Sequence, residues 1–209
     1  MTESIALFDP ALDAPAHHHP VYDYDSGPPV ERGKFAIWLF LATEVMFFSG
    51  LIGAYIVLRS AAGNWPNPAE RLAVDLTAGN TFVLITSSWF MVKALFAMEK
   101  DDRAGTLRWL GLTILGGSAF VSVQVFEYFK LYHEGALPHG DIFWSTFYVM
   151  TGFHGTHVVI GIIWLICTWF RTLKGDFSSK NYLGLELAGL YWHFVDLVWV
   201  LLFTIVYLF

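Results

Sequence analysis

Charged residues are scarce in this 209-residue sequence: Asp, Glu, Lys and Arg make up 14% of it, whereas an average soluble domain has about 25%. Hydrophobic residues reach 56% and aromatic residues 18%, a composition that indicates a membrane protein. The net charge is −6, so no basic stripe is available to neutralise nucleic-acid phosphates. We therefore expect no nucleic-acid partner.

Cysteine is nearly absent as well. The single Cys167 lies inside an apolar run, which excludes an internal disulfide and a thiolate cage for zinc or an iron-sulfur cluster. No glutamate is followed by His three residues later, so the motif of a carboxylate-bridged di-metal bundle is missing. The sequence also lacks the phosphate-loop, dinucleotide-binding and nucleophile-elbow motifs. These absences argue against a metal or catalytic centre in this chain.

Long apolar runs dominate the sequence instead. A helix that crosses a hydrocarbon layer of about 30 Å needs roughly 20 residues, and five runs are long enough. They cover approximately residues 34–58, 76–97, 107–131, 142–170 and 185–208. Short stretches with Gly, Pro or charged residues separate them. The expected fold is an all-α membrane protein, a bundle of five transmembrane helices over residues 34–209.

The N-terminal residues 1–33 are polar and rich in Pro, Asp and Gly, so we expect a disordered or loosely docked tail. Within it, His17, His18 and His19 could bind stray metal weakly, although a solvated tail is the simpler interpretation. The first apolar run is longer than the core of a signal peptide, which has roughly 7 to 15 residues. It is therefore expected to remain as a membrane anchor.

Basic residues are distributed unevenly between the two sides of the expected bundle. Of the twelve Lys and Arg residues, nine fall on the side of the N-terminus, and only Arg59, Arg71 and Lys130 fall on the other. Cytoplasmic loops of membrane proteins carry the excess of Lys and Arg. This predicts a cytoplasmic N-terminus and a C-terminus outside.

Several ionisable residues fall well inside the expected spans. At 1.5 Å of rise per residue, four lie at a similar depth near the midplane. These four are Glu44, His154, His157 and Asp196. His193 lies about one turn from Asp196 on the same helix face, and Glu127 lies nearer the outer surface. Because such groups are costly to insert into a membrane, they are the candidate functional residues.

Different roles for this polar belt stay open at this point. The side chains could be hydrogen-bonding groups that tie helices together, or proton carriers. An unpaired Glu44 would have to stay protonated or be held by a partner, and the nearest candidates are His154 and His157. A haem between His193 and either of them is geometrically possible, but Glu44 and Asp196 can satisfy these imidazoles without iron. A small proton-coupled transporter would also carry midplane carboxylates, yet neither an inverted repeat nor a broken helix is visible.

Three motifs resemble subunit III of the haem-copper cytochrome c oxidases. They are LATEVMFFSG at 41–50, TGFHGTHVVIG at 151–161 and YWHFVDLVWVLLFTIVYL at 191–208. The resemblance extends from about Lys34 to the C-terminus, with the motifs in the same order. It is closest to the short bacterial form with five helices, which lacks the first helix pair of the seven-helix form.

The resemblance implies a multi-pass subunit of the bacterial cytoplasmic membrane that itself holds no cofactor. The haem and copper would lie in partner subunits, with catalytic subunit I and subunit II as neighbours and phospholipid bound between the helices. Such a complex reduces oxygen to water with electrons from cytochrome c and translocates protons in aerobic respiration. Subunit III supports proton uptake and the stability of the catalytic subunit. A quinol oxidase, or the related protein of nitric oxide reductase operons, is the alternative within the family.

The resemblance also implies roles for the polar belt. Glu44 corresponds to the carbodiimide-reactive carboxyl of the family. Its two-histidine motif falls on His154 and His157. Its Trp-His-Phe-hydrophobic-Asp motif includes His193 and Asp196. In QVFEYF, residue Glu127 resembles another glutamate of the family. The resemblance therefore implies buried hydrogen-bonding partners in a redox-silent chain.

Overall fold

A computed structural model describes residues 32–209, which fold almost entirely into helices. Five of these helices are long and apolar enough to cross a membrane. They are α1 (Arg32–Ala61), α3 (Val74–Glu99), α4 (Arg103–His133), α5 (Ile142–Lys174) and α6 (Leu183–Phe203), which continues into a π-helix, η1 (Thr204–Leu208). The expected five-helix membrane fold is therefore present.

The helices extend beyond the predicted apolar runs by about a turn or less, because polar residues cap and complete their ends. The side chain of Asp102 accepts a hydrogen bond from the Gly105 N–H at the start of α4, and Asp141 does the same for Phe143 at the start of α5. Residues 1–31, with the histidines of the expected polar tail, lie outside the described range. Arg32 and Gly33, which we assigned to that tail, belong to α1.

Two short elements were not predicted from the sequence. A single helical turn, α2 (Pro68–Arg71), begins at the cap residue Asn67 and lies in the loop between α1 and α3. The last turn of the chain is a π-helix rather than an α-helix. Neither element has a long apolar period, so hydropathy alone could not reveal them.

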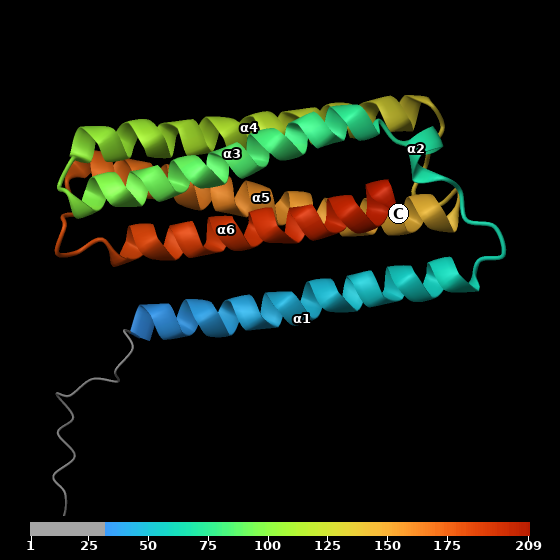
Figure 1. Ribbon diagram of the computed structural model, residues 1–209, viewed down its shortest axis with the longest axis horizontal. Coiled ribbons are helices and arrows are strands. Elements are labelled where there is room, and N and C mark those ends of the chain that lie inside the picture. Colours follow the sequence, from blue (N-terminus) through green and yellow to red (C-terminus); the bar gives the residue numbers. More distant parts are fainter. Residues whose placement is uncertain (1–31) are drawn as a thin grey trace, which may run out of the picture.

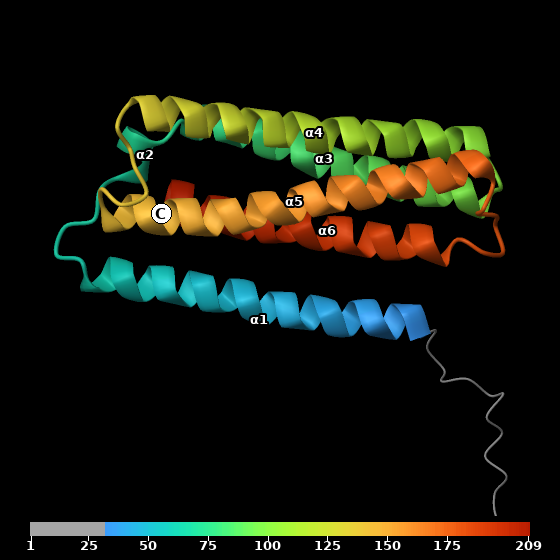
Figure 2. The ribbon, with the colours of Figure 1, turned by 180° about the vertical axis from the view of Figure 1, so that it is seen from behind.

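Four of the long helices form a bundle, and the fifth lies along its side. Neighbouring contacts link α3 to α4, α4 to α5, α5 to α6 and α6 back to α3, while α1 packs against α5 and α6. The two views from opposite sides both place α1 at the edge of the molecule, next to α6 and α5 (Figures 1 and 2). Of the five spans, α6 is the most buried and α1 the least. The helix α6 is therefore the centre of the fold.

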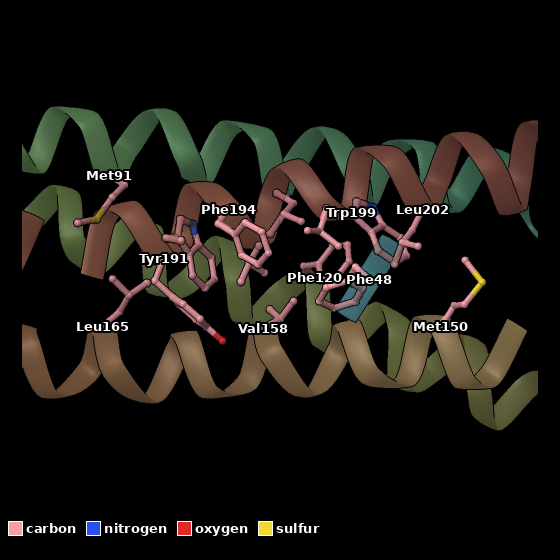
Figure 3. Close-up of a cluster of buried hydrophobic side chains, with 14 of the residues drawn as sticks. Phe48, Met91, Phe120, Met150, Val158, Leu165, Tyr191, Phe194, Trp199 and Leu202 are labelled. Atoms are coloured by element: carbon pink, nitrogen blue, oxygen red, sulfur yellow. The ribbon is translucent and has the colours of Figure 1, made fainter. Parts of the chain in front are cut away.

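Aromatic side chains of α6 fill much of the core. Trp192 and Trp199 are almost completely buried. The indole N–H of Trp192 donates to the Ser87 hydroxyl of α3 at 3.2 Å, and that of Trp199 donates to the Thr81 hydroxyl of α3 at 2.8 Å. Figure 3 shows Trp199 beside Phe120 of α4, with ring centroids 4.8 Å apart. Buried indoles normally find such a partner. These contacts join α6 firmly to α3 and α4.

One glycine is needed for this packing. A Cβ atom at Gly117 of α4 would lie 2.4 Å from Cη2 of Trp192, inside the contact distance of any real side chain. The glycine therefore leaves room for the indole between α4 and α6.

Candidate functional site

The polar residues predicted to form one belt are divided among separate places in the bundle. Glu44 meets His157 between α1 and α5, His193 meets Ser88 between α6 and α3, and Glu127 is enclosed by α3, α4 and η1. His154 and Asp196 form no hydrogen bond with each other. Of the four groups expected at a similar depth, only Glu44 and His157 therefore meet, because the side chains of His154 and Asp196 point to other sides of their helices.

The Glu44–His157 pair is the contact closest to the sequence expectation. Oε2 of Glu44 lies 3.0 Å from Nε2 of His157, and the two side chains are 17% and 16% exposed. Phe48 packs its ring edge against the His157 imidazole with centroids 5.1 Å apart, which shields the pair. The sequence predicts His154 or His157 as the partner of Glu44, and in the structure the partner is His157.

The second nitrogen of His157 restricts where the proton of this pair lies. Nδ1 is 2.7 Å from the carbonyl oxygen of Phe153, and a carbonyl oxygen can only accept a hydrogen bond. Nδ1 therefore carries a proton, and a neutral His157 has Nε2 as acceptor. The bond to Glu44 then requires one shared proton, either on the carboxyl group or on Nε2. In both forms, the pair holds a single proton between α1 and α5.

His154 corrects the expectation that both histidines are hydrogen-bonding partners. Its ring is completely buried, and within residues 32–209 neither nitrogen has a hydrogen-bond partner. The imidazole stacks on Trp199 with centroids 4.9 Å apart and meets the edge of Phe120 at 6.1 Å. Residues three apart lie on the same broad side of a helix, but their side chains point in different directions around the helix axis. His154 faces the bundle core, while His157 faces α1.

Glu127 is a buried carboxylate held by hydroxyl groups. It is 5% exposed, and it accepts hydrogen bonds from Thr77 of α3 at 3.4 Å and from Tyr207 of η1 at 3.2 Å. The π-helix at the end of the chain places Tyr207 in this position. A hydroxyl therefore lies beside each carboxylate oxygen, and the Tyr207 contact joins the C-terminal turn to the bundle. This arrangement favours a structural role for Glu127.

His193 and Asp196 lie on the side of α6 that faces α3. Nδ1 of His193 is 2.6 Å from the hydroxyl of Ser88. The same hydroxyl is also close to the Asp196 carboxylate. Oδ1 of Asp196 nevertheless has no hydrogen-bond partner among residues 32–209. The one-turn spacing predicted from the sequence thus puts both residues beside a common serine.

The sequence does not predict a further polar cluster between α4 and α5. Gln124 of α4 donates to the carbonyl oxygen of Thr151 at 3.0 Å, and the hydroxyls of Tyr128 and Thr151 are 2.5 Å apart. The only sequence signal for this cluster is Gln124, an uncharged polar residue inside an apolar run. It joins α4 to α5 at the level where Gly152 and Gly155 leave room for the Gln and Tyr side chains.

The described part of the chain, residues 32–209, contains no group of three or more His, Cys, Asp or Glu side chains that could hold a metal ion. Cys167 is an exposed residue of α5. The imidazoles of His154 and His193, which we considered as a haem pair, are a stacked ring in the core and a partner of Ser88. The polar side chains can therefore hold a proton, as the Glu44–His157 pair does, or join helices through hydrogen bonds, as His193 and Ser88 do.

Comparison with known proteins gives matches along most of the chain. The family model described as cytochrome c oxidase subunit III matches residues 21–209. A protein named cytochrome c oxidase subunit 3 from Synechocystis sp. is 41% identical, over 83% of this chain and 74% of that protein. A probable cytochrome c oxidase subunit 3 from Nocardia farcinica is also 41% identical, over 82% and 84%. A quinol oxidase subunit 3 from Bacillus spizizenii is 36% identical, over 85% and 89%.

Proposed function

We propose, because the chain belongs to the cytochrome c oxidase subunit III family, that it is the redox-silent accessory subunit of a terminal haem-copper oxidase. The complex would reduce oxygen to water and translocate protons, with the haem and copper in partner subunits. The observation that carries this proposal is the family match over residues 21–209, which includes all five spans. The lone, exposed Cys167 and the missing cluster of metal ligands in residues 32–209 support a cofactor-free role.

The Glu44–His157 pair is the part of this chain that suits a role in proton uptake. It holds one proton in a partly exposed position between α1 and α5, where a proton can be exchanged more easily than in the closed core. Glu44 is also the carboxyl expected to react with a carbodiimide, a reagent that attacks protonated carboxyl groups. We propose that this pair helps to keep proton delivery to the catalytic subunit fast and so prevents early inactivation during turnover.

Phospholipid binding is a further part of the proposal. A groove of about 470 Å³ runs between α4 and α5, and its walls are mainly apolar. Leu112, Leu115, Ile166 and Phe170 line it, and the exposed Arg108 lies at one end. Acyl chains suit such walls, and a guanidinium suits a lipid phosphate near the membrane surface. Lipid analysis of the purified complex, with an Arg108→Ala variant that retains less phospholipid, tests this assignment.

The orientation and the electron donor are also proposals. Nine of twelve basic residues lie on the side of the N-terminus, which supports a cytoplasmic N-terminus in a bacterial inner membrane. Relatives named as cytochrome c oxidase and as quinol oxidase subunits are similarly close, so both cytochrome c and a membrane quinol are candidate donors. A comparison of oxidase activity with reduced cytochrome c and with a quinol separates them.

The partner subunits are tested by purification through an affinity tag on this chain. We expect a mild detergent extract to yield the chain together with subunits I and II, identified by mass spectrometry, and with the absorption bands of haem. Recovery of the chain alone from membranes that contain active oxidase would contradict the proposal.

A further inference from the structure

The end of the bundle at which α1 begins carries two short turns that are fastened to each other. One turn joins α3 to α4 and the other joins α5 to α6, and both lie at the same end as the start of α1 (Figures 1 and 2). Asp101 accepts hydrogen bonds from the hydroxyl and the backbone N–H of Ser179, both at 2.6 Å, and Nε of Arg103 donates to the Thr172 carbonyl oxygen at 2.7 Å. These contacts hold the two turns, and the charged side chains on them, in fixed positions.

We call residues 32–34, 99–108 and 171–186 the N-terminal face. It contains eight basic and five acidic residues. Each acidic side chain already has a partner within the chain. The pairs are Glu99 with the Tyr182 hydroxyl, Asp101 with Ser179, Asp102 with the Gly105 N–H, Asp176 with Arg171, and Glu186 with Lys34. The acidic residues of this face are therefore engaged, and positive charge is in excess.

Three lysines carry much of this excess charge. Lys100, Lys174 and Lys180 are exposed, and none of them forms an ion pair with another residue of the range 32–209. Asp101 attracts Lys180 from the neighbouring turn, but Ser179 occupies both carboxylate oxygens of Asp101. The three ammonium groups can therefore accept an anionic partner without giving up a contact in the described chain.

The segment that precedes α1 has the opposite charge. Residues 1–31 contain six of the 18 acidic residues of the chain and none of its 12 basic residues, so the whole net charge of −6 lies in this segment. Its acidic residues are Glu3, Asp9, Asp13, Asp23, Asp25 and Glu31. Exposed charges of opposite sign attract each other over about 10 Å at 0.1 M salt.

The segment is also attached next to the face. A Cβ atom at Gly33 would lie 3.2 Å from Cδ2 of Leu183, and Leu183 follows Lys180 by only three residues. An extended chain covers about 3.3 to 3.6 Å per residue, so Lys180 lies within roughly 11 Å of Leu183 along the backbone. Asp25 is seven residues before Arg32 and can therefore reach the lysines of both turns.

Anionic lipid head groups would also be attracted to these lysines. The acidic segment differs from them because the chain itself joins it to the face. A short tether gives an effective concentration in the millimolar range, which does not depend on the lipid composition of the membrane. Charge complementarity and attachment together favour the segment as the occupant.

We propose that residues 1–31 bind the N-terminal face of their own chain, with Asp23, Asp25 and Glu31 paired to lysines of the α3–α4 and α5–α6 turns. The proposal is independent of the proposed function, because it concerns one chain alone. It assigns an occupant to the basic surface at this end of the bundle.

Coupling by a water-soluble carbodiimide, which links a carboxylate directly to a neighbouring lysine, tests the contact. The full chain is placed in nanodiscs of phosphatidylcholine, coupled, digested and analysed by mass spectrometry. We expect amide links from Asp23, Asp25 or Glu31 to Lys100, Lys174 or Lys180. Lys130 is the matched control, because its side chain is 55% exposed at the other end of the bundle. A mixture of unlabelled and ¹⁵N-labelled chains distinguishes links within one chain from links between two.

The expected yield of these links falls at least fivefold between about 0.01 and 1 M salt, since the screening length shortens from about 30 to about 3 Å. The Lys34–Glu186 pair, 2.9 Å apart between α1 and α6, is the internal standard for the coupling reaction. The proposal is overturned if the segment links equally to Lys130, links only to a second chain, or forms no link to the three lysines.

A distance measurement tests the contact without a reagent that modifies carboxylates. Nitroxide labels are placed at positions 26 and 178 in a Cys167→Ser chain, and their separation is measured by pulsed electron paramagnetic resonance. We expect a narrow, short distance distribution that broadens to longer distances in Lys174→Gln/Lys180→Gln and is unchanged in Lys130→Gln. An equal distribution in all three forms would refute the proposal. Release of the segment when phosphatidylglycerol replaces phosphatidylcholine would refute it too, because the face would then bind lipid.

Discussion

Removal of the Glu44 carboxyl group is expected to weaken the attachment of α1 to the bundle. Glu44→Leu leaves Nε2 of His157 without its partner at 3.0 Å, in a place shielded by Phe48. Hydrogen bonds between membrane helices contribute about 0.6 kcal/mol on average and up to about 1.7. An orphaned buried group costs about 1 to 3 kcal/mol. Because the two side chains are 17% and 16% exposed, we expect the lower part of this range, about 1 to 2 kcal/mol.

Glu44→Gln is expected to lose less than about 0.5 kcal/mol, because an amide N–H can donate to Nε2 without a change in the tautomer that the Phe153 carbonyl requires. Thr43→Leu is the control. Thr43 neighbours Glu44 on α1, is exposed, and bonds only the Phe40 carbonyl of its own helix. The free energy of unfolding is measured in bicelles by denaturant titration or steric trapping.

A double-mutant cycle isolates the pair. Combining Glu44→Leu with His157→Leu is expected to show a coupling of about 0.6 to 1.7 kcal/mol. Carbodiimide labelling at position 44 is expected to disappear in Glu44→Gln although the complex still assembles. The reasoning is refuted if Glu44→Leu costs no more than Thr43→Leu, or if the Gln variant is as unstable as the Leu variant.

Three further predictions concern the rest of the fold. Glu127→Leu leaves the buried Tyr207 hydroxyl without its acceptor and is expected to lower the free energy of unfolding by about 1 to 3 kcal/mol, measured in bicelles. Gly117→Ala is expected to cost about 1 to 3 kcal/mol in the same assay, since its Cβ would lie 2.4 Å from the enclosed Trp192 ring, and a loss near zero would contradict this. Hydrogen bonds from the hydroxyl and backbone N–H of Ser179 hold the pKa of Asp101 below its ordinary value of 3.8, so this loop contact is expected to persist above pH 3.8 and to be lost as the pH falls through the lower folded pKa. The protection factor for amide exchange at Ser179 is expected to fall there, and to be low already at neutral pH in Asp101→Ala.

The spans and the family could be predicted from the sequence because both depend on signals that are local in the chain. Five apolar runs of sufficient length require five spanning helices. The ends were less accurate, since a cap such as Asp102 starts a helix before its apolar run: α4 begins at Arg103, whereas the run begins at 107. The π-helical last turn carries no sequence signal, yet it places Tyr207 on Glu127.

The partners of the polar residues could be predicted only in part. Depth along a helix follows from counting residues, so the reach of Glu44 to the two-histidine motif was foreseeable, and the structure confirms the contact with His157. The direction of each side chain depends on which helices become neighbours. That is why His154 was expected to form a hydrogen bond and instead stacks on Trp199. The functional roles of these residues remain predictions.

The most direct test of a cofactor-free role compares the cofactor content of the oxidase complex before and after this chain is removed. The complex is purified in mild detergent, the chain is stripped off by a harsher one, and haem, copper and iron are quantified in both fractions by absorption and metal analysis. We expect the stripped complex to keep all of its haem and copper and its first turnover with oxygen, while its activity decays sooner. Stoichiometric haem or copper in the released chain would contradict it.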